Sequence, residues 1–296
     1  MNRPGHALAG IAFAILAVAC FATLDTTTKY ISVSVPVLMA LWVRYAFQAI
    51  ATTLYALPTM GRRVLYTKHP KYQFLRGVLL LCTSAFAFFS LKYLPVGEFT
   101  AIVMITPLVI TLLAATTLGE RVSPLRWTLV AGGFVGTLII LRPGGGAFSW
   151  SMLLPLGLVA SNAWFQVLTS KLARTEAPLT LHFYTGWVGT VLASLALPFV
   201  WEQIDSWTLW AAMLLMGLMG TVGHFFLIQA YARAPAATLM PYLYSQIGFA
   251  MLGGWLVFSH IADAASMMGM ALIGVCGAAG GWLTLYESRA RVRARA

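Results

Sequence analysis

Charged side chains are scarce in this sequence. Only 9% of the 296 residues are Asp, Glu, Lys or Arg, whereas about 25% is usual for a soluble domain. Hydrophobic residues make up 60% of the chain, and the mean hydropathy is +0.82. A globular chain of this length cannot bury so much apolar surface, so water is excluded as its main solvent. The same composition excludes a disordered chain, a coiled coil and a secreted disulfide scaffold.

Residues that could hold a metal, a disulfide or a nucleotide are also few or unsuitably spaced. The three cysteines lie inside apolar runs and form no CxxC pair, so we expect buried thiols. The histidines show no metal-ligand spacing; they are His6, His69, His182, His224 and His260. The glycine run 144–146 is not followed by a lysine, so it is not a nucleotide-binding loop. We expect no metal, no cofactor and no catalytic residue.

Long apolar runs dominate what is present. Ten runs, bounded by charges, Gly and Pro, are each close to the roughly 20 residues that a helix needs to cross a bilayer. They cover residues 7–28, 34–57, 74–92, 96–118, 123–142, 150–171, 178–200, 207–231, 236–258 and 264–286. Chain in lipid must satisfy its own backbone groups, and these runs are too long for barrel strands. The sequence predicts one all-α integral membrane domain over residues 1–296.

The basic residues lie on one side of the expected membrane. With ten spans, fifteen of the 19 Lys and Arg residues fall on the side of the N-terminus and three on the other, while Arg44 lies within a span. Positive charge stays in the cytoplasm, so both termini are expected there, including a basic tail at 287–296. Because the net charge of +11 sits in short loops and not along one face, nucleic acid is not an expected partner.

The two halves of the chain match each other weakly. A shift of 142 residues places Lys29 on Lys171 and Pro36 on Pro178, and a shift of 139 places 90–95 on 229–234. We therefore expect two five-helix repeats, at 7–142 and 150–286. Since five is an odd number, the second repeat must be inverted relative to the first. Inverted repeats are typical of transporters, with the substrate site near the midplane between the halves.

Several short motifs in the first half carry a family resemblance. Residues 90–101 read Ser-Leu-Lys-Tyr-Leu-Pro-Val-Gly-Glu-Phe-Thr-Ala, and they are followed by Thr106-Pro107-Leu108, Leu118-Gly119-Glu120-Arg121 and the glycines Gly132, Gly133 and Gly136. This pattern is similar to the EamA-type repeat of the drug/metabolite transporter superfamily, and within it to YddG-type bacterial amino-acid exporters. The second half departs from the pattern, with Ser259-His260 opposite Glu120-Arg121 and Gln246 opposite Pro107.

The resemblance implies a ten-helix carrier in a bacterial inner membrane. Its two inverted halves would enclose a central cavity and work by alternating access. Helices 1, 3, 4, 6, 8 and 9 would surround the cavity.

Polar residues within the spans are the candidates for binding substrate. One convergent set lies at similar depth in spans six, eight and nine: His224, Asn162, Tyr242, Ser245 and Gln246. Further candidates in spans three, four and six are Thr83, Ser84, Thr106, Trp164 and Gln166. The alternative for each Ser or Thr is a structural hydrogen bond between helices, worth about 0.6 kcal/mol.

Charged residues inside or at the ends of spans are candidates for gating or ion pairing. A charge at the bilayer centre costs about 2.5–3.5 kcal/mol, so Arg44 needs a partner. Asp25 could pair with Arg44, or with Lys29 one helical turn away. Such a pair would either lock helices together or gate the cavity. Lys92 and Glu98 are expected at the outer ends of spans three and four.

These residues predict a secondary transporter that exports small amphiphilic metabolites, with amino acids first. Amides, hydroxyls and aromatic rings with few fixed charges suit a neutral zwitterion. A multidrug cation exporter is the first alternative, a nucleotide-sugar carrier the second, and a channel or an enzyme is more remote. A facilitator is favoured over proton antiport, for which His224 and Asp25 would be the relays. The expected partners are the substrate and the bilayer; a monomer is expected, and a dimer through Gly-rich spans stays open.

Overall fold

The computed structural model describes residues 4–93, 103, 105–120, 122–141, 153–259 and 264–293. Every regular element in these residues is a helix. The elements are α1 (Pro4–Ile31), α2 (Val37–Met60), the 3₁₀ helix η1 (Gly61–Leu65), α3 (Pro70–Tyr93), α5 (Thr106–Thr117), α6 (Pro124–Leu141), α7 (Leu153–Leu172), α8 (Pro178–Val200), α9 (Trp207–Tyr231), α10 (Ala236–Leu243), α11 (Gln246–Phe258) and α12 (Ala264–Arg293).

These helices fall on the ten predicted spans, which confirms the all-α membrane fold. Six stretches of the described chain are long and apolar enough to cross a membrane: His6–Ile31, Val37–Leu65, Pro70–Ser90, Leu153–Leu172, Pro178–Val200 and Trp207–Tyr231. The other four predicted runs are occupied by α5, by α6, by the pair α10 and α11, and by α12. The ten-span count is consistent with this arrangement. Residues 287–293, expected as a basic tail, continue α12.

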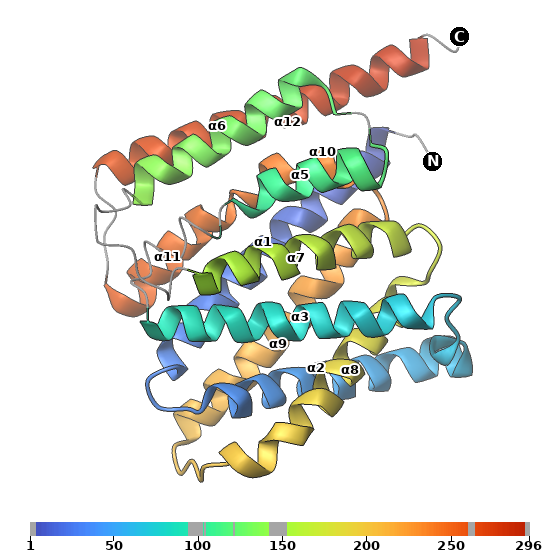
Figure 1. The fold of residues 1–296 in the computed structure, drawn as a ribbon. Helices are drawn as coiled ribbons and strands as arrows, with labels where there is room; N and C mark the ends of the chain where they lie inside the picture. The colour runs from blue at the N-terminus through green and yellow to red at the C-terminus, as the bar shows by residue number, and fades with distance from the viewer. Residues whose placement is uncertain are drawn as a thin grey trace.

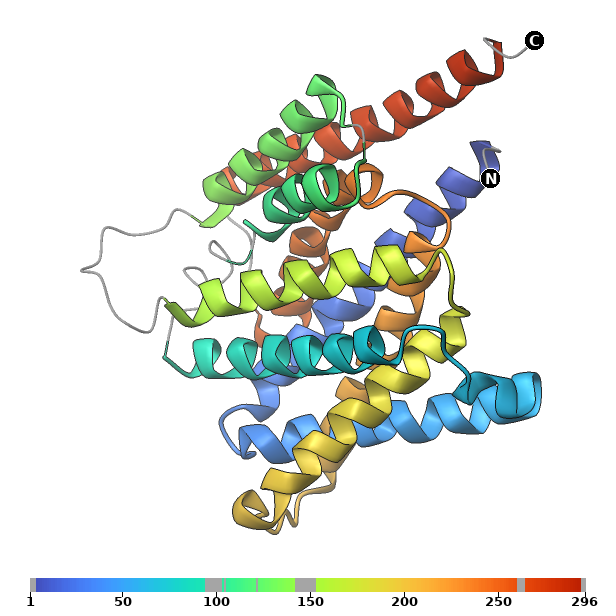
Figure 2. The ribbon, with the colours of Figure 1, turned by 45° about the vertical axis from the view of Figure 1, so that its right-hand side comes forward.

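The helices run back and forth between two ends of one bundle (Figures 1 and 2). Helix α1 begins and α12 ends at the same end, which we call the terminal end. The connections that follow α2, α5, α7 and α9 also lie there, and they carry most of the basic loop residues. The other end, where α1, α8 and α11 finish, is called the opposite end.

The positive-inside rule predicts that the terminal end faces the cytoplasm. A green fluorescent protein fused after Ala296 should fluoresce, and alkaline phosphatase fused there should be inactive. Phosphatase inserted in the loop 201–206, at the opposite end, should be active. The reverse pattern of activity would contradict this orientation.

Contacts between helices repeat when the two halves are exchanged. In this exchange α1 corresponds to α7, α2 to α8 and α3 to α9. Accordingly, α1 packs on α9 and α7 packs on α3. In the same way, α2 packs on α9 and α8 packs on α3. Helix α1 packs on α10 and α11 as α7 packs on α5. The pairs α2–α8, α6–α12 and α5–α10 map onto themselves. Helices α1 and α7 run in opposite directions (Figure 1). This layout is consistent with two inverted five-helix repeats, as expected.

The ninth span is broken, whereas the sequence predicts one helix over 236–258. Helix α10 ends at Leu243 and α11 begins at Gln246. The carbonyl of Tyr242 accepts from both the amide (3.1 Å) and the hydroxyl (2.6 Å) of Ser245, so this side chain competes with the helical bond. Pro241, inside α10, has no amide hydrogen to donate. The break places Gln246 at the start of a new helix.

Glycines in the fifth span bring α6 and α12 together within one chain. A Cβ added at Gly132 would lie 2.7 Å from Cys276 Sγ, and one at Gly136 would lie 2.9 Å from the Gly269 carbonyl oxygen. Small residues allow such close approach of helices in lipid. The Gly132 and Gly136 faces are therefore occupied by this chain's own α12.

Candidate substrate cavity

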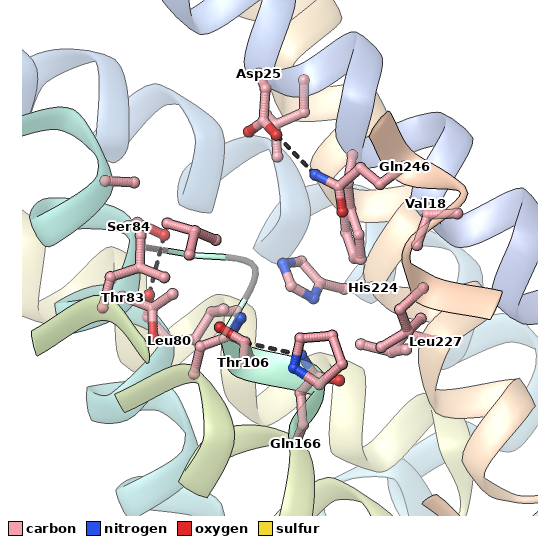
Figure 3. Close-up of a pocket in the computed structure, with 18 of the residues that line it drawn as sticks. Val18, Asp25, Leu80, Thr83, Ser84, Thr106, Gln166, His224, Leu227 and Gln246 are labelled. Carbon is pink, nitrogen blue, oxygen red and sulfur yellow. Dashed lines mark hydrogen bonds between the residues drawn. The ribbon is translucent and has the colours of Figure 1, made fainter. Parts of the chain in front are cut away.

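A cavity of about 160 Å³ lies in the middle of the bundle between the two halves. Its walls come from α1, α3, α5, α7, α9, α10 and α11, which are the spans that the resemblance implies, together with Arg44 from α2. Seven of the ten predicted binding residues line it: Thr83, Ser84, Thr106, Asn162, Gln166, His224 and Gln246. Figure 3 shows the ring of His224 projecting into the space between Ser84 and Gln246.

Helical spacing explains why these side chains meet. On α7, Leu158, Asn162 and Gln166 are four residues apart and share one face. On α1, Phe21 and Asp25 are spaced in the same way and also line the cavity. Each helix thus presents one narrow stripe to the cavity.

Arg44 forms one wall of the cavity and is buried, with 8% of its surface exposed. Its Nη1 donates to Ser84 Oγ at 3.0 Å, and its Nη2 lies 3.1 Å from His224 Nε2. The hydroxyl of Tyr45 lies 2.9 Å from the same Ser84 Oγ. The guanidinium is therefore held by neutral groups on α3 and α9.

The contact with Arg44 fixes the tautomer of His224. Arginine has no acceptor, so Nε2 of His224 must accept and the ring hydrogen must be on Nδ1. That Nδ1 is buried and has no hydrogen-bond partner in the described part of the chain. The rings of Phe21 and Phe165 lie 4.8 and 5.7 Å from the imidazole, centroid to centroid. His224 thus offers one unused N–H donor beside the cavity.

Asp25 forms the acidic wall, and Figure 3 shows it beside Gln246, above the ring of His224. Its Oδ2 accepts from Nε2 of Gln246 at 2.8 Å, a bond between α1 and α11. Although both Asp25 and Arg44 line the cavity, the structure shows no ion pair between these two described residues. The terminal nitrogens of Arg44 are engaged by Ser84 and His224 instead. The cavity therefore carries a positive and a negative group held apart.

Gln166 lines the cavity on the side of the terminal end (Figure 1). Its Nε2 donates to Asn162 Oδ1 at 3.2 Å, and its Oε1 accepts from the Tyr231 hydroxyl at 2.5 Å.

Two threonines complete the predicted residues of the cavity lining. Thr106 Oγ1 is buried and has no partner among the described residues. Thr83 donates to Ser161 Oγ at 3.0 Å, an interhelical bond of the structural kind.

Four of the other predicted residues, Tyr242, Ser245, Trp164 and Lys29, do not line this cavity. Tyr242 is buried near Gly280 of α12, and the hydroxyl of Ser245 is bound to the Tyr242 carbonyl. Trp164 is on an exposed face of α7. The ammonium of Lys29 lies 5.0 Å from the centre of the Phe258 ring. Glu98 is outside the described residues, and so is the side chain of Lys92.

Two residues that support the cavity were not predicted. Tyr45 and Tyr231 each place a hydroxyl on a cavity residue, Ser84 and Gln166 respectively. Both are buried, and a buried tyrosine hydroxyl usually finds a polar partner. Tyr45 directly follows Arg44 in sequence. Tyr231 is four residues beyond Leu227 and therefore shares its helix face, and this spacing was the sequence feature that could have identified it.

Comparison with known proteins places this geometry in a family. The profile of the EamA-like transporter family matches residues 8–142. The chain is 32% identical to a riboflavin transporter of Rhizobium johnstonii over 280 residues, covering 92% of this chain and 90% of that protein. It is 24% identical to an S-adenosylmethionine uptake transporter of Rickettsia conorii, covering 90% of both chains.

The fold is shared with a solved structure as well. A crystal structure of a protein superposes on this chain with a TM-score of 0.77 at 20% identity, covering 95% of this chain and 98% of that one. At that identity the match concerns the fold alone. Taken with the near full-length relatives and the central cavity, it leads to one conclusion: this chain belongs to the EamA-like transporter family and is a multi-pass membrane transporter.

Proposed function

We propose that this protein is a secondary transporter of small dipolar metabolites that carry an α-amino-acid group, amino acids among them. The supporting observation is the pair of separated charges, Arg44 and Asp25, in one cavity. A substrate carboxylate would accept from Arg44 and from the free Nδ1–H of His224. A substrate ammonium would donate to Asp25. A buried charge such as that of Arg44 is tolerated when it is paired and hydrogen-bonded, and Asp25 is exposed, so a dipolar solute can pair with both walls.

Riboflavin is the second candidate, because a riboflavin transporter matches the chain over nearly its whole length. Neutral donors and acceptors such as Asn162, Gln166 and Thr106 suit the edges of a polar ring system. The two charged walls would have no charged counterpart on riboflavin. S-adenosylmethionine, named for another relative, carries the α-amino-acid group that our first proposal requires.

Transport would proceed by alternating access between the two halves. At about 160 Å³, the cavity is smaller than the roughly 300–1,000 Å³ of most ligand pockets, so the helices around it must separate to admit a metabolite. We propose that the protein is a facilitator that exports its substrate down a concentration gradient. Arg44 is the single Lys or Arg residue of the described cavity lining, which disfavours a nucleotide-sugar carrier.

Counterflow in proteoliposomes tests the proposed substrate class. Liposomes loaded with unlabelled substrate receive labelled amino acids, S-adenosylmethionine or riboflavin, with and without a pH gradient. Saturable amino-acid counterflow that competes with S-adenosylmethionine and needs no pH gradient is the expected result. Counterflow of riboflavin alone would replace the first candidate by the second, and dependence on the pH gradient would contradict the facilitator.

Asp25→Asn should separate the two candidates. It removes the negative wall but keeps an oxygen that accepts from Gln246, so we expect amino-acid counterflow to fall at least tenfold through a higher KM. Riboflavin counterflow should change little. Asp205→Asn, at an exposed loop aspartate whose described contact is with Gln203, is the matched control and should behave as the parent. Equal loss for both substrates would argue against an ammonium site at Asp25.

A further inference from the structure

One carboxylate ties three separate segments together at the terminal end of the bundle. Glu120, just after α5, accepts from Arg174 Nη2 at 2.6 Å through Oε1. Its other oxygen accepts from the backbone amide of Ala237, in the first turn of α10, at 3.1 Å. The Glu120 side chain is 8% exposed, whereas that of Arg174 is 48% exposed. Because α5 belongs to the first half and α10 to the second, Glu120 joins the two halves.

This connection lies directly beyond the floor of the cavity. Gln166 and Leu227 line the cavity, and the hydroxyl of Tyr231 is bound to Gln166 on its terminal side. Helix α10, to which Glu120 is bonded through Ala237, also carries the lining residue Leu243. From the cavity toward the terminal end, the described contacts therefore come in two groups, Gln166 with Tyr231 and then Glu120 with its partners.

The matching position in the second half has no carboxylate. The shift of 139 residues that aligns the repeats places Ser259 opposite Glu120. Ser259 ends α11 at the opposite end of the bundle, with a left-handed φ of 55°. In an inverted repeat, equivalent residues close the cavity alternately at the two ends. At the terminal end, Glu120 bonds to a helix N-terminus through its carboxylate. At the opposite end, Ser259 has no carboxylate and cannot make the same bond.

We propose that Glu120 is the positioning residue that holds the cavity closed at the terminal end, and that its replacement by Ser259 in the second half biases the resting carrier toward this closed conformation. The inference rests on the alternating-access part of the proposed function, not on the substrate. A carboxylate that accepts from an arginine and from a helix N-terminal amide makes charge-assisted bonds. Losing both should shift the equilibrium between the two conformations about tenfold.

Accessibility of a single cysteine tests this directly and needs no substrate. In a chain with Cys20, Cys82 and Cys276 changed to Ala, Leu227→Cys places a thiol at the cavity floor. A membrane-impermeant maleimide is added to sealed vesicles of either orientation, so that it reaches only one end of the bundle. We expect Glu120→Ala to raise the labelling rate from the terminal end about tenfold and to lower it from the opposite end.

Graded variants separate gating from general destabilisation. Arg174→Gln keeps the bond from Glu120 to Ala237 and removes an exposed partner, so it should have a smaller effect than Glu120→Ala. Glu176→Gln is the matched control at the same end, since Glu176 accepts from Thr67 and Lys68 and not from α10; its labelling should equal the parent's. Faster labelling of Glu120→Ala from both ends, or unchanged labelling from the terminal end, would overturn the proposal. If Glu120→Ala does not fold, Glu120→Gln, which keeps one acceptor, must show the same asymmetry.

Discussion

Transport by the Arg44→Gln variant is expected to fall by about 100-fold. Arg44 lines the cavity with its charge uncompensated by a described carboxylate in hydrogen-bond contact, and it is held in place by Ser84 and His224. A hydrogen bond to a charged group contributes roughly 1.5–3 kcal/mol, and the substrate carboxylate would lose both the charge and the donor. The measurement is the initial rate of counterflow in proteoliposomes as a function of substrate concentration. We expect most of the loss in KM.

A purely structural role for Arg44 would give a different result. If the guanidinium serves only to lock α2 to α3 and α9, Arg44→Gln should lower the melting temperature and leave the KM of the folded fraction unchanged. Arg44→Lys keeps the charge but not the two-pronged geometry, so partial recovery of KM would support carboxylate binding. Arg62→Gln, in the exposed η1, is the control and should not change transport. An unchanged KM in Arg44→Gln would contradict the assignment.

Gly189→Ala is expected to destabilise the protein by about 1–3 kcal/mol, the usual cost of overpacking. A Cβ at this position of α8 would overlap the ring of Tyr45 on α2. The Tyr45 ring cannot easily move, because it is fully buried and its hydroxyl contacts Ser84. Since Ser84 also binds Arg44, the displacement should reach the cavity and reduce transport as well. Thermal unfolding in detergent, followed by size-exclusion chromatography, measures the stability.

The matched control for Gly189 is Gly254, a helical glycine in α11. A Cβ added there meets no atom within 4 Å. Gly254→Ala should therefore be neutral or stabilise the protein by up to about 1 kcal/mol, because alanine favours the helix. Equal melting temperatures for the two variants would show that the approach of α8 to Tyr45 is looser than described.

The sequence alone predicted the membrane fold because the signals for it are local. Apolar runs near 20 residues and basic loops on one side depend on residues close together along the chain. The same locality explains why Asn162 and Gln166 both line the cavity, because their spacing of four places them on one face of α7. Trp164 lies between them in sequence but on another, exposed face of the helix, so it does not line the cavity.

The partners of the polar groups were decided only by the tertiary structure. Asp25 binds Gln246, 221 residues away, and Arg44 binds His224, 180 residues away; the sequence offered Arg44 or Lys29 as partners of Asp25. Position along a helix gives the depth of a side chain in the membrane, but the rotation of each helix and its neighbours decide which groups at that depth meet. The bond from Tyr231 to Gln166 depends on the same packing. In lipid a polar side chain binds whichever donor or acceptor the packed helices bring to it, because water is absent.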